Sequence, residues 1–251
     1  MLGFTRTTPI TLYAFTSVPT LAEVFPPVEL TKCFPEWWRN LPSHATLPQS
    51  NGRAVSQPPT IKHCYALQEL FKRGIGLRLW RDVFVTIEAD GNVVSDGPKA
   101  KTVRLGTSHP SFQFPNAFNT TTQHYKFFSP WSFVCEQPVH FTITHPMYHQ
   151  RDPFRFHTMT GLVEYRHQHS TEINILLPRV AGQRTELSFT AGEMMAYLVP
   201  MSASPVKVVA EEISAAEMDR VNAAKHFTLF PILFNKRHRL PPYIPESVRS
   251  R

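Results

Sequence analysis

The amino-acid sequence predicts a mainly β protein, an antiparallel β-sandwich or barrel with two short helices and extended, proline-rich terminal arms. Apolar residues make up 42% of the 251 residues, and the 19 phenylalanines suit the interior of a sandwich or barrel. The 23 prolines outnumber the 10 glycines, and many stand singly between short apolar runs, as expected for short strands joined by tight turns. Strands and helices do not alternate along the chain, so a parallel nucleotide-binding sheet is not expected.

The helices and strands follow from the spacing of apolar residues. Residues 61–73 have apolar side chains at helical spacing, and Thr60 and Gly74 are suitable caps. A second amphipathic helix is predicted at 214–226. In the predicted strands apolar and polar residues alternate, and Asp90-Gly91 is a strong hairpin signal. We expect the strands within the ranges 9–15, 76–94, 125–146 (two strands that turn at 136–138), 161–178, 185–189, 193–201 and 206–213.

The segment 26–59 is too rich in proline and too poor in periodicity to form regular structure. It carries Phe34, Trp37 and Trp38, and exposing these rings to water would be unfavourable because burying each one is worth roughly 1.5–3 kcal/mol. We therefore predict that the three rings form an interface with another subunit. The alternative is that they pack on their own domain.

The chain is predicted to have three regions. Residues 1–60 hold a strand and the proline-rich arm, residues 61–213 form the β-rich core domain, and residues 214–251 hold a short helix and a basic, proline-rich tail. The tail carries most of the net charge of +7. Because proline and like charge prevent such a segment from building a core, removal of 236–251 is expected to leave the melting temperature almost unchanged. If the tail binds a partner, nucleic acid or an acidic surface is expected, through Lys236, Arg237, Arg239, Arg249 and Arg251.

The cysteines and the apolar runs indicate the compartment. Cys33, Cys64 and Cys135 lie far apart, which argues against a disulfide framework and fits a reducing environment. No stretch approaches the roughly 20 apolar residues of a membrane span. The N-terminus lacks the charged and then apolar layout of a signal peptide. We expect a protein that is neither inserted in a membrane nor secreted.

The sequence contains no recognisable catalytic constellation, so no catalytic residue is predicted. The histidine-rich segment comes nearest, because Gly161, His167, His169 and Glu172 make the pattern G-x5-H-x-H-x2-E. This resembles the first metal-binding motif of cupins, in which two histidines on one strand face share a metal with a carboxylate. The second cupin motif is missing, since no histidine occurs between His169 and His226. We therefore expect no metal and no cofactor, and interpret the segment as a polar turn, with a cupin-like β-barrel enzyme as the alternative.

Two segments in the C-terminal half of the chain carry a second resemblance. The apolar stretch GLVE (161–164) and the run SFTAGEMMAYLV (188–199) are similar to the closing strands of dUTPase-like β-clip folds. The phosphate-binding motifs of those enzymes are absent. The resemblance therefore implies a shared strand–turn–strand arrangement and no shared catalysis.

The order of several segments carries a third resemblance. These segments are ITLYAFT (10–16), PEWWRNLP (35–42), TIKHCYALQELFKRGIGLRLWRDVFVTI (60–87), SPWSF (129–133), THPMYHQRDPF (144–154), GLVEY (161–165) and TAGEMMAYLVPM (190–201). In order and spacing the chain resembles a family of uncharacterised proteins of marine tailed phages and some bacteria. The resemblance implies a phage gene product, found in the virion or the host bacterial cytoplasm.

In that context the sequence favours a non-enzymatic structural or assembly protein. We expect a virion component of a tailed bacteriophage that acts through protein–protein contacts with itself or with other virion proteins. Two alternatives stay open: the metal-dependent cupin-like enzyme and a nucleic-acid-binding accessory protein.

Overall fold

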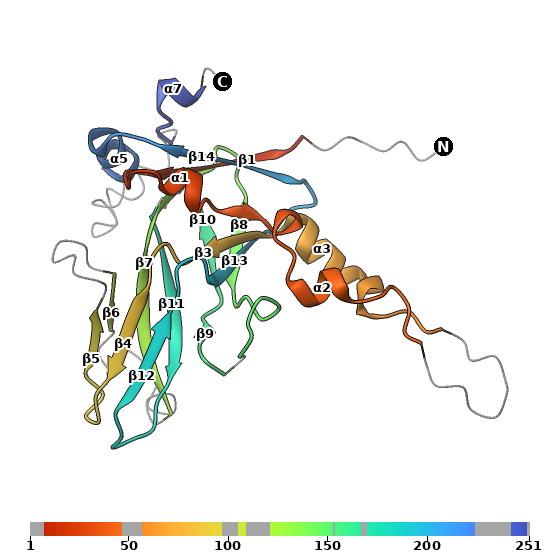
Figure 1. Ribbon diagram of the computed structural model, residues 1–251. Coiled ribbons are helices and arrows are strands. Elements are labelled where there is room, and N and C mark those ends of the chain that lie inside the picture. Colours follow the sequence, from red (N-terminus) through yellow and green to blue (C-terminus); the bar gives the residue numbers. More distant parts are fainter. Residues whose placement is uncertain are drawn as a thin grey trace.

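Figure 1 shows a computed structural model that describes residues 8–46, 57–96, 105–108, 121–152, 154–166, 170–223 and 242–249. Within these ranges the chain is mainly β, as the sequence predicts, and its strands form three sheets. The described strands form no closed barrel. Of the two predicted architectures, the structure therefore corresponds to sheets packed on a shared core.

The largest sheet has six strands. In spatial order it contains β14 (Val206–Glu212), β1 (Ile10–Thr16), β7 (Thr122–Val134), β11 (Ser170–Pro178) and β9 (His157–Thr158), with β6 (Gly106–Ser108) beside β7. β1 and β14 pair in parallel, whereas the other strand pairs of the described residues are antiparallel. β11 alternates between half-buried and buried positions along its whole length, as expected for a strand with one face on a core.

The second sheet has five strands and the third has three. The five-stranded sheet contains β10 (Gly161–Glu164), β8 (His140–Thr144), β13 (Met194–Pro200), β3 (Ile75–Arg78) and β2 (Val28–Glu29), and the three-stranded sheet contains β12 (Thr185–Phe189), β4 (Val83–Ile87) and β5 (Val93–Asp96). β13 is buried at nearly every position, because the core covers one face and a helix covers the other.

All three sheets contribute side chains to one apolar core. Aromatic residues dominate its interior, and Phe127 of the six-stranded sheet meets Phe189 of the three-stranded sheet with their ring centroids 5.4 Å apart. In the same core Phe133 and Phe141, from different sheets, both contact Tyr165. The abundance of phenylalanine in the sequence is explained by this packing.

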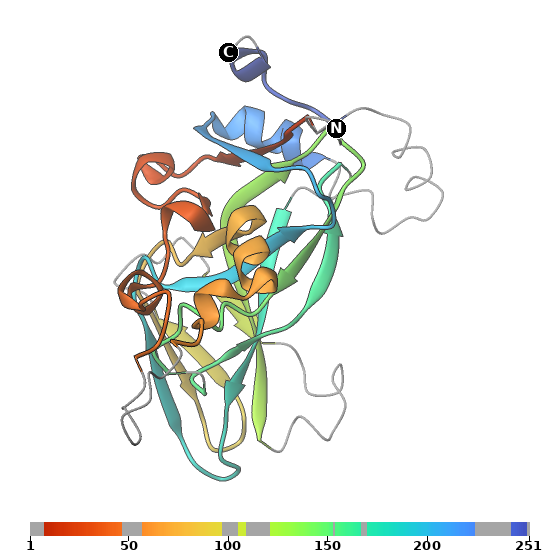
Figure 2. The same ribbon diagram turned by 90° about the vertical axis from the view of Figure 1, so that its right-hand side faces the viewer.

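The two predicted helices are present. The first is a short 3-10 turn, η2 (Ile61–His63), followed by α3 (Tyr65–Arg73), and the Thr60 side chain accepts a hydrogen bond from the backbone of Lys62. α3 buries Leu67 and Phe71 and lies over the outer face of the five-stranded sheet, in orange in Figure 2. Position 74 requires glycine because the Leu30 side chain packs directly against it, and a Cβ atom there would lie 2.5 Å from that side chain. The backbone at Gly74 is not left-handed.

The second predicted helix is α5 (Ala215–Asn222), which begins at a capping box made by Ser214 and Glu217. The predicted hairpin at Asp90-Gly91 joins β4 and β5, and Gly91 adopts a positive φ of 90°. The two strands predicted within 125–146 are also present and turn at the predicted place. They do not pair with each other, because β7 and β8 belong to different sheets.

The prediction that segment 26–59 lacks regular structure is wrong for the residues described. After α1 (Leu21–Val24), the chain forms β2, the 3-10 turn η1 (Leu30–Lys32) and α2 (Glu36–Asn40). Leu30 is fully buried under α3. Burial of apolar side chains against α3 and β13 outweighs the low helix and strand propensity of this proline-rich segment.

The prediction that the C-terminal tail contributes nothing to the core is also wrong for residues 242–249. This segment ends in α7 (Glu246–Arg249). It joins a second, smaller core that draws on all three predicted regions and contains Phe15, Val134, Ile213, Val221, Ile244 and Val248. The boundaries predicted at residues 60 and 213 therefore do not separate independently packed units.

Candidate functional site

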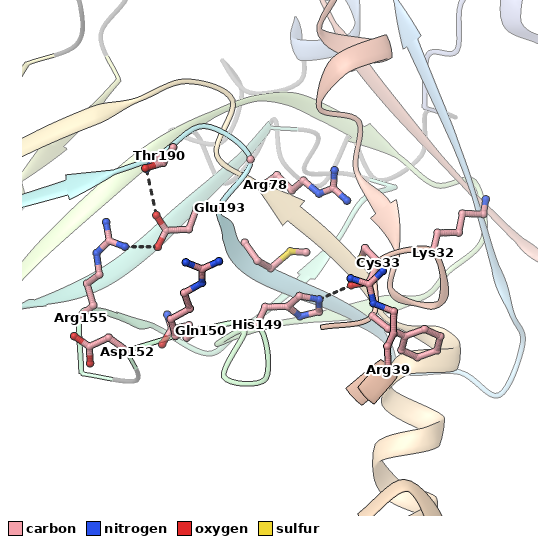
Figure 3. Close-up of a pocket in the computed structure, with 14 residues that line it drawn as sticks. Lys32, Cys33, Arg39, Arg78, His149, Gln150, Asp152, Arg155, Thr190 and Glu193 are labelled. Carbon is pink, nitrogen blue, oxygen red and sulfur yellow. Dashed lines mark hydrogen bonds and ion pairs between the residues drawn. The ribbon is translucent and has the colours of Figure 1, made fainter. Parts of the chain in front are cut away.

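A cleft of about 690 Å³ opens between four segments that are far apart in the sequence (Figure 3). One wall comes from η1 and α2, and the opposite wall from residues 149–152 and Arg155 of the loop after β8. The end of β3 and the turn 190–194 that leads into β13 complete it. We call this cavity the basic cleft, because five cationic and only two acidic side chains line it.

The acidic side chains do not neutralise the cations of the basic cleft. Arg155 pairs with Glu193 at 2.9 Å, and Lys32 pairs with Glu29, outside the cleft, at 3.0 Å. Arg39, Arg78 and Arg151 also line the cleft. Within the described ranges, none of their guanidinium groups forms an ion pair with a carboxylate. The cleft therefore carries an uncompensated positive charge that suits an anionic ligand.

Arg78 is the least exposed of these three arginines. It ends β3, where its neighbour in register on β13 is Met194, and it is half-buried. Its guanidinium group lies beside the thiol of Cys33. Burial raises the pKa of this thiol, and Arg78 offsets the rise only in part. Cys33 therefore stays protonated at neutral pH and is a poor nucleophile.

One end of the cleft is held by a fixed ion pair. Glu193, which pairs with Arg155, also accepts a hydrogen bond from the backbone N–H of Thr190 at 3.2 Å. Gly192 between them has a positive φ of 85°, which allows the tight turn. The Arg155 guanidinium lies 4.7 Å from the ring centre of Phe189. These contacts fix the position of Arg155 before any ligand binds.

His149 connects the two walls of the basic cleft. Its Nε2–H donates to the backbone carbonyl of Cys33 at 2.6 Å, and its Nδ1 accepts from the hydroxyl of Tyr197 at 2.5 Å. Because a carbonyl can only accept, this geometry places a proton on Nε2, and in the neutral ring Nδ1 is then the acceptor for the Tyr197 hydroxyl. Burial first, and then the charge of Arg78, lower the pKa of His149. Both ring nitrogens are engaged, so His149 serves as a structural link rather than as a base.

The lowered pKa of His149 predicts a pH-dependent stability. The unfolded chain binds a proton near the ordinary value of 6.5, whereas the folded protein resists protonation. The stabilising contribution is complete above that value and is lost as the pH falls through the lowered pKa of the folded state. We expect a smaller drop in melting temperature between about pH 7.5 and about pH 5.5 for His149→Gln than for the wild type.

His145 provides an internal reference for this measurement. Its pKa is also lowered, by burial and by His157, on which its ring stacks at 4.5 Å. Because His145 is intact in the variant, His149→Gln should keep part of the pH dependence. Identical drops in the two proteins would show that His149 does not contribute.

The predicted interface residues pack within their own chain. Phe34 and Trp38 contact Phe71 of α3, with ring centroids 5.3 Å and 4.7 Å apart. The indole N–H of Trp37 donates to the backbone carbonyl of Tyr148 at 2.8 Å. These contacts correspond to the alternative that the rings pack on their own domain. Trp37 is still 39% exposed, and an interface role for it stays a prediction.

The predicted metal ligands are only partly within the described residues. His167 and His169 lie outside them, whereas Glu172 forms an ion pair of 2.7 Å with Lys126. Within the described ranges, no three His, Cys, Asp or Glu side chains are grouped as a metal site would require. Of the basic tail, Lys236, Arg237, Arg239 and Arg251 also lie outside the described residues. Arg249 pairs with Glu136 at 3.2 Å.

The basic cleft was not among the sites predicted from the sequence. Comparisons of the chain with known protein families and with curated proteins found no match. The one signal in the sequence was indirect: segments 35–42, 60–87, 144–154 and 190–201, which contribute to the phage-family resemblance, each supply residues to the cleft. Among the helices that the structure describes, none has the length and apolar character needed to cross a membrane.

Proposed function

We propose that the protein is a non-enzymatic assembly protein that docks onto another protein of a tailed-phage particle. The observation that carries this proposal is the exposed surface of the two segments that wall the basic cleft, which carries the apolar side chains of Trp37, Met147 and Phe154. These side chains are 39%, 58% and 84% exposed. We call this surface the docking face.

The docking face lies on two segments that are fixed to each other. Trp37 belongs to α2, and Met147 and Phe154 belong to the loop that follows β8. The hydrogen bond from Trp37 to Tyr148 joins the two segments. A surface that is ordered before binding loses less conformational entropy when a partner docks.

The composition around the cleft supports a protein partner. Protein interfaces are enriched in aromatic residues, Met and Arg, and the energetically dominant residues are often Trp, Tyr and Arg. The docking face supplies the apolar side chains, and Arg39 and Arg151 lie on the same two segments. A partner with apolar side chains and an acidic edge would complement this surface.

The chemistry of the cleft supports binding rather than catalysis. Its thiol, Cys33, is held in the protonated form, and both nitrogens of His149 are occupied by hydrogen bonds. The carboxylate of Glu193 is paired with Arg155. The placement in a phage particle or the host cytoplasm rests on the sequence resemblance.

The test replaces the two most exposed side chains of the docking face. We expect Met147→Ser plus Phe154→Ser to lower the amount of the protein in purified particles at least about tenfold, since each large apolar side chain buried is worth roughly 1.5–3 kcal/mol. Quantitative mass spectrometry of particles measures this amount. The melting temperature should change little, because both side chains are exposed.

The control is Val180→Ser plus Met201→Ser, which makes similar replacements at exposed positions outside the docking face. This variant should enter particles as the wild type does. A wild-type protein that is absent from particles, and that stays monomeric at high concentration in analytical ultracentrifugation, would contradict the assembly proposal.

A further inference from the structure

We infer that the basic cleft is a binding site for a small phosphorylated ligand, with Arg78 as its anchoring residue. This site shares the segments of Arg39 and Arg151 with the docking face but is centred on Arg78, and it goes beyond the proposed assembly role. Three features of the cleft support this inference: the half-buried charge of Arg78, the distribution of charge along the cleft, and the size and lining of the cavity.

A half-buried charge without a counter-ion is unfavourable unless a ligand supplies one. Arg78 is half-buried at the end of β3, and its guanidinium group lies beside the thiol of Cys33, which is protonated and carries no charge. Within the described ranges its guanidinium group has no carboxylate partner. The desolvation cost of such a group is offset when an oxyanion binds to it. Arginine keeps its charge at every physiological pH and can bind an oxyanion through two parallel hydrogen bonds.

Charge is unevenly distributed along the cleft. Figure 3 shows Asp152, Glu193 and Arg155 at one end, with Lys32 and Arg39 at the other. The acidic end is already occupied by the ion pair between Arg155 and Glu193. Lys32 is paired with Glu29, so the ligand's negative charge is expected beside Arg39 and Arg78.

The directions from which the cations approach favour a phosphoryl group over a carboxylate. Arg39 comes from α2, Arg78 from β3 and Arg151 from the loop after β8, so donors reach the cavity from three different segments. A tetrahedral oxyanion with two negative charges can accept hydrogen bonds from several directions. A planar carboxylate is satisfied by a single guanidinium group.

The size and lining of the cavity favour a small molecule. Its volume of about 690 Å³ lies within the roughly 300–1,000 Å³ of small-molecule sites. Phe34 and Met194 also line it and provide apolar surface for the rest of the ligand. A nucleic-acid strand would instead require a stripe of cations that follows its backbone.

The test uses inorganic pyrophosphate as the probe in isothermal titration calorimetry on the full chain. We expect the wild type to bind it, and Arg78→Gln to weaken binding at least about tenfold, since a charge-assisted bidentate contact is lost. Arg78→Lys should bind pyrophosphate with an intermediate affinity, because lysine keeps the positive charge but lacks the paired N–H donors of the guanidinium group. Arg39→Gln should weaken binding several-fold. Because Arg39 is exposed, this variant tests the site even if the Arg78 variants fold poorly.

The matched control is Arg220→Gln, which removes one exposed positive charge from α5, outside the cleft. It should bind pyrophosphate as the wild type does. Equal affinities for Arg78→Gln and Arg220→Gln would overturn the inference. Citrate binding as tightly as pyrophosphate would also overturn it, because the site would then not select a phosphoryl group.

Two further titrations complete the test. The first distinguishes a small phosphorylated ligand from a nucleic-acid backbone, and the second distinguishes anion binding from particle docking. A short single-stranded oligonucleotide that binds more tightly than pyrophosphate, and loses this binding in Arg78→Gln, would replace the small ligand with a nucleic-acid backbone. The docking variant Met147→Ser plus Phe154→Ser should still bind pyrophosphate, because it leaves every cation in place. Failure of particle docking and failure of anion binding are thus measured independently.

Discussion

Replacing Phe71 with alanine is expected to lower the free energy of unfolding by about 3–5 kcal/mol, the range for removing a large aromatic side chain from a core. Phe71 is 1% exposed. Its ring contacts Phe34, Trp38, Tyr148 and His149, with centroids 5.3, 4.7, 6.0 and 6.5 Å away. These neighbours come from α2, from the segment before it and from the loop after β8. The cavity left by the substitution would therefore loosen both walls of the basic cleft.

Denaturation in urea, followed by circular dichroism, measures this loss of stability. Tyr65→Ala is the matched control, because Tyr65 lies on the same helix and is 73% exposed. We expect Tyr65→Ala to change the free energy of unfolding by less than about 0.5 kcal/mol. Similar effects of the two substitutions would show that the aromatic cluster does not hold α3 against the cleft. Phe71→Ala should also weaken pyrophosphate binding at temperatures where it is still folded.

Deleting residues 242–251 is expected to lower the free energy of unfolding by about 2 kcal/mol or more. The deletion removes Ile244 and Val248, which are buried against Phe15, Val134 and Val221. Full burial of each such side chain is worth roughly 1.5–3 kcal/mol, and the entropy that the shorter chain regains offsets part of the sum. This expectation reverses the one drawn from the sequence, which treated the whole tail as dispensable for stability.

Point substitutions separate the role of these apolar contacts from that of chain length. Ile244→Asp in the full chain should be destabilising by a similar amount, because it places a charge in the same core. Ser247→Asp, at an exposed position of the same segment, should leave the melting temperature almost unchanged. If Ile244→Asp and Ser247→Asp had the same melting temperature, the C-terminal segment would not be part of the fold.

Local sequence patterns predicted most of the individual elements. The cap at Thr60, the hairpin at Asp90-Gly91 and the alternation along β11 depend on residues that are close together in the chain, and all three are present. Local patterns did not predict α2 or the packing of residues 242–249. These segments have weak propensities of their own and are ordered by contacts with distant parts of the chain.

The pairing of the strands could not be predicted in the same way. The sequence indicated two strands and a turn within 125–146, which resembles a hairpin, yet β7 and β8 separate into different sheets. β1 pairs in parallel with β14, almost 200 residues away. Alternation shows which side chains face a core, but it carries no information about which strand lies alongside.

The sequence by itself determined the mainly β class, the two longer helices and the excess of positive charge. Only the tertiary structure decided where that charge acts. In the sequence most of it lies in the C-terminal tail, whereas Arg39, Arg78 and Arg151 lie in three separate segments that the fold brings to one cleft. Secondary structure depends on neighbours within a few residues, whereas a binding site depends on side chains that meet only when sheets and loops pack together.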